Sequence, residues 1–189
     1  MAKAKTRRIS KQERQRQRAQ ARRRQVLIWV GLAAVALALV GFVGWRATSQ
    51  PHPGKSVPSM GNQHIEPAQV GSIIYNSTPP TSGPHLTQIA PWGIHTEPIA
   101  NELQVHNLED GGVMVQYNCQ DCDELVSQLA EVVRRYSDHV ILAPYPNMDS
   151  TIALTAWGRI DTFDEFDRDR IVAFIEAYAG LDHHAAYSP

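Results

Sequence analysis

The chain has 189 residues, of which 20% are charged and 43% are hydrophobic, and its formal net charge is −1. This composition excludes a wholly disordered polyelectrolyte, and the length suits one domain with an appendage. The near-neutral total conceals an asymmetry, because residues 1–25 hold eleven Lys and Arg against one acid, whereas residues 46–189 hold seven basic and eighteen acidic side chains. The distribution excludes a simple soluble cytosolic enzyme and a globally basic nucleic-acid-binding protein.

Residues 26–45, VLIWVGLAAVALALVGFVGW, contain no charged side chain and are long enough to cross a bilayer as a helix. Trp29 and Trp45 lie near the two ends of this segment, where indole rings prefer the membrane interface. The basic tail, residues 1–25, flanks only the amino-terminal side, so the positive-inside rule predicts a cytoplasmic N-terminus. We expect a single-pass protein of the cell membrane with its C-terminal domain outside the cytoplasm. A cleaved signal peptide is the alternative, although the apolar segment is longer than such peptides usually have.

The basic tail has two alternative partners. A basic helix beside a membrane is attracted to anionic headgroups, which favours membrane lipid as the partner of the tail and of the apolar helix. Nucleic acid is the alternative, but residues 10–25 lack the interleaved aromatic side chains that stack on bases. We therefore expect lipid contact and no nucleic-acid partner, and the protein partner is left open.

The part beyond the apolar segment divides into three regions. Residues 46–69 contain four prolines and few large apolar side chains, which predicts an extended linker. Residues 70–181 then form one small domain. Residues 182–189 are expected to be a solvated tail that includes His183 and His184.

The pattern of the domain predicts an α+β fold, a small sheet with two packed helices and a long Pro/Gly/His-rich loop. The loop is residues 76–101. Strands are expected at 70–75, 103–108, 112–118, 139–143 and 151–157. Two helices show one apolar face each, the first with Leu125, Leu129, Val132, Val133 and Tyr136, the second, starting near Asp167, with Ile171, Phe174, Ile175 and Tyr178. A thioredoxin-like arrangement is compatible with this order.

Three segments carry a family resemblance: PPTSGPH at 79–85, VHNLEDGGVMVQY at 105–117 and APYPNMDSTIALTAWGR at 143–159. In this order they resemble the domain-of-unknown-function family 3105, found in bacterial membrane-anchored and secreted proteins. The resemblance spans roughly residues 60–180 and implies no activity. The family pattern in the middle segment is Leu-Glu-His-Gly, and Asp110 stands here at the position of that histidine. A carboxylate can replace an imidazole for harder metals, so Asp110 is a candidate ligand.

All eight histidines lie outside the apolar segment. Imidazole is the commonest metal ligand and suits copper and zinc, and the candidates in the loop-rich first third of the domain are His64, His85, His95 and His106. Methionine thioethers, from Met60, Met114 or Met148, would favour Cu(I). No two histidines are spaced three or four residues apart, so the ligands would have to converge through folding. The alternative is that each histidine caps a loop. We predict copper first and zinc second as the bound metal.

Cys119 and Cys122 are the only cysteines, and they lie between a predicted strand and a predicted helix. This is the placement of thioredoxin-like redox sites. However, Asp121, Asp123 and Glu124 surround the pair, and their negative charge disfavours the reactive thiolate. We therefore predict a structural disulfide between Cys119 and Cys122, because an extracytoplasmic compartment permits it.

Three classes of function follow from these features. The first is a membrane-tethered metal-binding domain without catalytic residues, and it is the one we favour. The second is an enzyme, a thiol-disulfide oxidoreductase that uses Cys119 and Cys122. The third is a non-catalytic interaction domain of the cell envelope. No Gly-x-Ser-x-Gly motif is present, and no catalytic triad is predicted.

Overall fold

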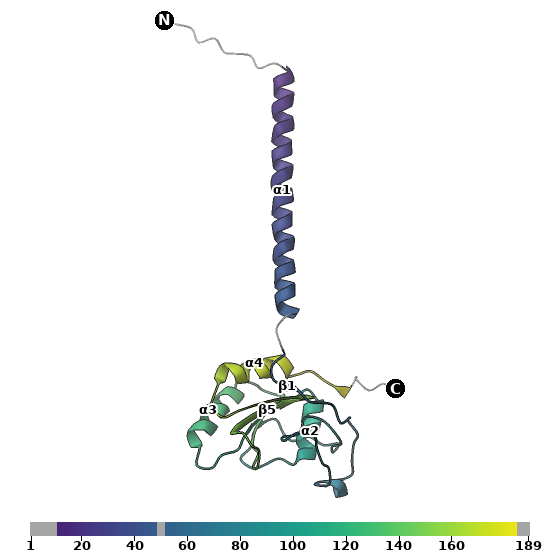
Figure 1. Ribbon diagram of the computed structural model, residues 1–189, viewed down its shortest axis with the longest axis vertical. Helices are drawn as coiled ribbons and strands as arrows, with labels where there is room; N and C mark the ends of the chain where they lie inside the picture. Colours follow the sequence, from purple (N-terminus) through teal and green to yellow (C-terminus); the bar gives the residue numbers. More distant parts are fainter. Residues whose placement is uncertain (1–10, 49–51, 185–189) are drawn as a thin grey trace. The chain divides into compact units, whose positions relative to one another are not determined.

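The computed structural model describes residues 11–48 and 52–184 (Figure 1). The chain divides into two compact units, Met1–Pro51 and His52–Pro189. In the first unit, α1 (Lys11–Thr48) is one helix of 38 residues. Its segment Arg22–Phe42 is long and apolar enough to cross a membrane. The first ten residues of the basic tail lie outside the described residues.

The second unit is built on a six-stranded mixed sheet, which confirms the predicted α+β class. The strand order is β1-β6-β5-β3-β4-β2. Strands β2, β4 and β3 are parallel, and the pairs β3/β5, β5/β6 and β6/β1 are antiparallel. The strands are β1 (Lys55–Ser56), β2 (Gly93–Ile94), β3 (Val113–Tyr117), β4 (Val140–Pro144), β5 (Ile152–Ala156) and β6 (Arg159–Phe163). The short β1 comes from the segment that we expected to be a linker.

Helices lie on both faces of this sheet. They are α2 (Asn101–Glu109) on one face and α3 (Asp123–Val133) with α4 (Arg168–Tyr178) on the other, whereas the short 3-10 helix η1 (Pro67–Gln69) buries no residue. Successive side chains of β3 point to opposite faces of the sheet, so neighbouring residues contact different helices. Val113 and Val115 join the apolar cluster of α3 and α4, whereas Met114 packs with Leu108 of α2 on the other face.

The helices α3 and α4 follow the predicted pattern. On α4 the expected face of Ile171, Phe174, Ile175 and Tyr178 is buried. Asp167 caps the helix, because its carboxylate accepts a hydrogen bond of 3.0 Å from the backbone N–H of Arg170. The helix ends just before Gly180, whose φ of +81° is the left-handed conformation that glycine adopts readily.

Two predicted strands are wrong, and three observed strands, β1, β2 and β6, were not predicted. Residues 103–108 belong to α2. The helical period was missed because every residue from Gln104 to Glu109 is buried, so the helix has no exposed polar face. Residues 70–75 form no strand, and Ile74 is 90% exposed. Strand β6 alternates weakly between buried and exposed positions, which leaves little signal in its five residues.

Candidate metal centre

A segment of the expected linker and a segment of the long loop lie side by side at the centre of the site. His64 and His85 form a parallel β-bridge. The backbone N–H of Ile65 donates to the carbonyl of His85 at 2.8 Å, and the N–H of His85 donates to the carbonyl of Gln63 at 3.0 Å. These two bonds fix the positions of both histidine Cα atoms, so the imidazoles start from a rigid backbone.

Side-chain hydrogen bonds fasten the loop to its surroundings. The Tyr75 hydroxyl donates to the carbonyl of Pro84 at 2.7 Å. Asn107 of α2 holds Ala90 on both sides, accepting from its N–H at 2.8 Å and donating to its carbonyl at 2.9 Å. Because Asn107 is completely buried, these bonds lie out of competition with water. The loop is therefore a packed part of the domain.

The end of helix α2 supplies three further side chains of a type that can bind metal. His106, Glu109 and Asp110 are spaced i, i+3 and i+4, which places them on one side of the helix end. His106 and Glu109 are buried, and Asp110, the C-cap residue, is partly exposed. The sequence analysis placed His106 on a strand, where this relation to Glu109 could not be seen.

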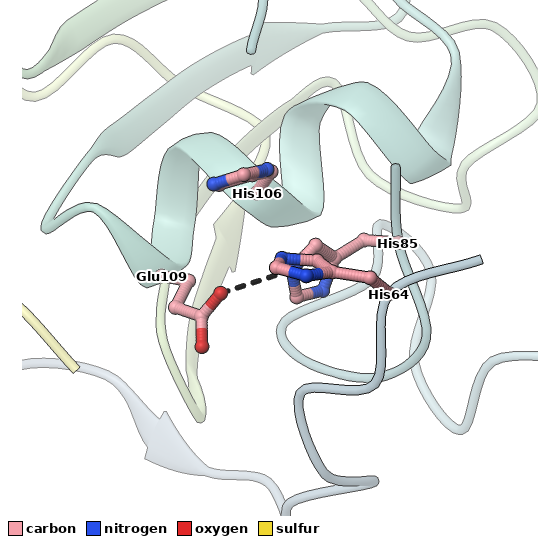
Figure 2. Close-up of side chains that lie close together, drawn as sticks. All are labelled: His64, His85, His106 and Glu109. Carbon is pink, nitrogen blue, oxygen red and sulfur yellow. Dashed lines mark ion pairs between the residues drawn. The ribbon is translucent and has the colours of Figure 1, made fainter. Parts of the chain in front are cut away.

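We call His64, His85, His106 and Glu109 the inner group, because their possible ligand atoms all lie within 4.8 Å of one another. The rings of His64 and His85 are 5.0 Å apart between centroids, and those of His64 and His106 are 5.3 Å apart. Figure 2 shows the two loop histidines facing His106 and Glu109 on the helix. His64 is exposed and the other three side chains are buried, so the group reaches from the interior to the surface.

Backbone carbonyls determine which ring nitrogens carry protons. Nδ1 of His85 lies 2.8 Å from the carbonyl oxygen of Gly83, and Nδ1 of His106 lies 2.6 Å from that of Leu86. A carbonyl oxygen only accepts, so each Nδ1 must donate. In the neutral rings Nε2 is then the unprotonated nitrogen with a free lone pair. The same second-shell contact orients histidine ligands in metal sites.

The closest contact in the inner group joins two acceptors. Nε2 of His85 lies 2.9 Å from Oε2 of Glu109, with both side chains almost fully buried. Burial lowers the pKa of His85, which favours the neutral ring at pH 7. Within the described residues neither of these two atoms has a hydrogen-bond partner. A lone pair facing a carboxylate is unfavourable, so the contact is favourable only with a proton on Nε2, which makes it a buried ion pair, or with a metal ion bound by both atoms.

The remaining oxygen of Glu109 is fixed by its own partner. Nδ2 of Asn62 donates to Oε1 of Glu109 at 2.7 Å. Asn62 comes from the segment before His64, so the residues that precede the predicted domain boundary also orient the site. The carboxylate is thereby turned so that Oε2 faces the histidines.

The C-terminal segment also reaches the site. Backbone N–H groups of Gly180 and His183 donate to the carbonyls of Gly111 and Glu109 at 2.8 and 2.9 Å. These bonds bring His184 beside α2, although we expected this residue in a solvated tail. Nε2 of His184 lies 3.5 Å from Oε2 of Glu109 and 3.5 Å from Oδ1 of Asp110. Its hydrogen bond to Asp182 raises the pKa of His184.

We call His106, Asp110 and His184 the outer group, whose possible ligand atoms also lie within 4.8 Å of one another. Of the five predicted metal ligands, the structure thus brings four into one region and leaves one apart. Nε2 of His95 lies 2.7 Å from the carbonyl of Pro91, and His95 belongs to neither group. Glu109 and His184 were missed. The spacing of His106 and Glu109 would have revealed Glu109 once the segment was assigned to a helix.

The predicted sulfur candidates are three methionines and the cysteine pair. Sδ of Met60 accepts from the backbone N–H of Asn76, and Met114 and Met148 are buried. The sulfur atoms of Cys119 and Cys122 lie at disulfide distance before α3, as predicted. The ligand atoms of the two groups are nitrogen and oxygen, which suit zinc and copper(II).

These features define a small α+β domain with a buried histidine–carboxylate cluster, in a chain whose helix α1 contains a segment apolar enough to cross a membrane. The sequence profile of the domain-of-unknown-function family 3105, described as a protein family of unknown function, matches residues 66–187. The chain therefore belongs to this family, which confirms the resemblance. His64 and Asn62 precede the matched region. Neither a curated protein nor a solved structure gives a significant match to the chain.

Proposed function

We propose that this protein is a membrane-anchored domain that binds a divalent transition-metal ion in the inner group. The observation that carries the proposal is the convergence of three imidazoles and the Glu109 carboxylate, with Nε2 of His85 and Oε2 of Glu109 buried and without a hydrogen-bond partner among the described residues. A metal ion held by both atoms would remove their repulsion and satisfy both lone pairs. His64 and His106 would complete a set of four ligands around the ion.

The chemistry of the ligands limits which metal ions the site can bind. Three imidazoles and one carboxylate suit zinc, which takes four nitrogen, oxygen or sulfur ligands in tetrahedral sites. Copper(II) accepts the same donors and binds more tightly than zinc at a given site. Calcium and magnesium prefer oxygen ligands and are disfavoured. The proposal is therefore zinc or copper(II), with the site's geometry deciding between them in the cell.

The cellular placement is part of the same proposal. The apolar segment Arg22–Phe42 would anchor the chain in the cell membrane, with the basic tail on anionic lipid inside the cell. The domain would then lie outside the cytoplasm, where a disulfide between Cys119 and Cys122 is stable. A reporter fused after the domain should be active only outside the cytoplasm, and cytoplasmic activity would contradict this topology.

Metal binding tests the proposal directly. The full chain, purified in detergent and stripped with a chelator, should bind Zn²⁺ and Cu²⁺ in calorimetric titrations. His85→Ala and His106→Ala should each weaken binding by about 10–100-fold or more, since even second-shell losses have effects of this size. His95→Ala is the matched control, because its ring bonds a backbone carbonyl away from the cluster. Unchanged binding in the His85→Ala/His106→Ala double variant would refute the proposal.

One observation favours a second candidate, a thiol-disulfide oxidoreductase. Strand β3, helix α3 and strand β4 form a parallel βαβ unit, and the Cys119–Cys122 pair lies at the amino end of its helix. A C-x-x-C pair at such a place is typical of thioredoxin-like redox proteins. Insulin reduction by the full chain, compared with Cys119→Ser, tests it. Rapid turnover that the variant loses would move this candidate ahead of metal binding.

A further inference from the structure

Two ligating side chains have no place in a four-ligand inner site. Asp110 and His184 lie against it and form the outer group with His106. His184 arrives from a segment that follows the last helix by only a few residues, and backbone hydrogen bonds hold that segment on α2. The question is what these two side chains do, and the following inference rests on the proposed function.

Two of the three distances in the outer group match those between ligands of one metal ion. Ligand atoms around a tetrahedral zinc ion, with bonds of about 2.0–2.2 Å, lie roughly 3.3–3.6 Å apart. Oδ1 of Asp110 lies 3.6 Å from Nε2 of His106 and 3.5 Å from Nε2 of His184. These separations are too long for hydrogen bonds and match the edges of such a tetrahedron.

The orientation of His184 is fixed as it is for the buried histidines. Its Nδ1 lies 2.8 Å from Oδ1 of Asp182, and the N–H of His184 donates to the same oxygen at 2.9 Å. A carboxylate on Nδ1 directs the free Nε2 toward the cluster, as second-shell carboxylates do for zinc ligands. The side chain of His184 is 44% exposed, so this position opens to solvent.

We propose that the outer group is a second metal position, so that the filled domain holds two divalent transition-metal ions. His106 has one free nitrogen, because its Nδ1 donates to the carbonyl of Leu86. It can therefore serve one ion at a time. With both positions filled, the outer ion is bound by His106, Asp110 and His184. The inner ion is then bound by His64, His85 and Glu109. Each ion then has two imidazoles and one carboxylate.

Glu109 lies between the two positions. Its Oε2 is 2.9 Å from Nε2 of His85 on the inner side and 3.5 Å from Nε2 of His184 on the outer side. A carboxylate in this place contributes negative charge to both ions and lowers their mutual repulsion. The second ion nevertheless binds more weakly than the first, because it withdraws His106 from the inner ion.

Metal counting on the full chain in detergent tests the second position. The chelator-stripped protein is titrated with Zn²⁺ alone, and bound zinc is counted by native mass spectrometry and elemental analysis. The wild type should take two ions in two steps of decreasing affinity. His184→Ala and Asp110→Asn should each take one. His183→Ala is the matched control and should take two, since that ring stacks on Trp157 and belongs to neither group.

The outcomes separate this inference from the proposed function. One ion in the wild type, lost in His85→Ala and kept in His184→Ala, would overturn the second position and leave the inner site standing. Two ions in both His184→Ala and Asp110→Asn would also overturn it. No bound ion in the wild type would overturn both proposals. Because His184 and Asp110 are at least partly exposed, their replacement does not open the core.

Discussion

The two faces of the sheet are built on opposite principles, although they share the same strands. One face packs α3 and α4 through aliphatic and aromatic side chains. The other face packs α2 and the long loop with a small apolar cluster surrounded by buried polar groups, namely Thr81, Ser82, His85, Glu102, Gln104, His106, Asn107, Glu109, Gln116 and Thr155. The first face therefore supplies most of the apolar burial that stabilises the fold. The second face uses its buried volume to hold polar side chains in place.

The largest expected effect comes from the apolar face. Phe174 is completely buried among α3, α4 and the sheet, so Phe174→Ala should cost about 3–5 kcal/mol of unfolding free energy through the cavity that it leaves. Urea unfolding followed by circular dichroism measures this cost. Ile74→Ala is the control, because that side chain is 90% exposed and should change stability by less than about 0.5 kcal/mol. A loss below about 1 kcal/mol for Phe174→Ala would contradict this assignment.

Metal should make the polar face a second source of stability. An ion that binds only the folded protein, present at about 100 times its dissociation constant, adds about 2.7 kcal/mol. Thermal unfolding should shift upward when Zn²⁺ is added and return when a chelator removes it. The His85→Ala/His106→Ala double variant should show no such shift. An equal shift in that variant would place the stabilising ion elsewhere.

A buried amide pair on the polar face offers a sharper test without metal. Nε2 of Gln116 on β3 donates to Oε1 of Gln104 on α2 at 2.7 Å, and both side chains are buried. Gln116→Leu leaves the buried Oε1 of Gln104 without its donor, while Nε2 of Gln104 keeps its bond to Asn101, and should cost about 1–3 kcal/mol. Gln104→Leu/Gln116→Leu removes both partners and should cost less than the sum of the single variants. Strict additivity in this double-mutant cycle would refute the coupling.

The smallest expected effect is a pH dependence of the metal-free protein. Burial lowers the pKa of His85 and of His183 below the ordinary value of 6.5, so at these two rings the unfolded chain binds more protons than the folded one, whereas the raised pKa of His184 acts in the opposite direction. The stability that these rings contribute is present above pH 6.5 and is lost as the pH falls through their lowered folded values. Chemical unfolding of chelated protein at several pH values measures it. His85→Gln should flatten the dependence, and a steeper profile would contradict the sign.

The same contrast explains what the sequence could predict. The helices α3 and α4 each bury one face, and the resulting period was readable from Leu129 or Phe174 and their neighbours. Helix α2 is buried on nearly every side, so its sequence carries no such period and was taken for a strand. The error hid the i, i+3 relation of His106 and Glu109, and with it the carboxylate of the inner group.

The remaining part of the site depended on long-range contacts. His64 was predicted as a ligand, but its pairing with His85 rests on a single β-bridge between two irregular segments. His184 reaches the cluster through backbone bonds to the end of α2, which no local pattern of side chains indicates. Local sequence therefore identified candidate ligand residues, and the convergence of the chain decided which of them lie together.

The spacing of the ligands along the chain gives a bound ion a mechanical role. An ion held by His64 and His106 closes a loop of about 40 residues, and the outer group extends the tie to His184, near the end of the described chain. The Cys119–Cys122 disulfide spans a sequence separation of 3. The entropy that a cross-link removes from the unfolded chain grows with the length of the loop that it closes. A bound metal would therefore be the long-range cross-link that stabilises this domain. Unlike the disulfide, this cross-link can be removed by a chelator and restored by a metal salt.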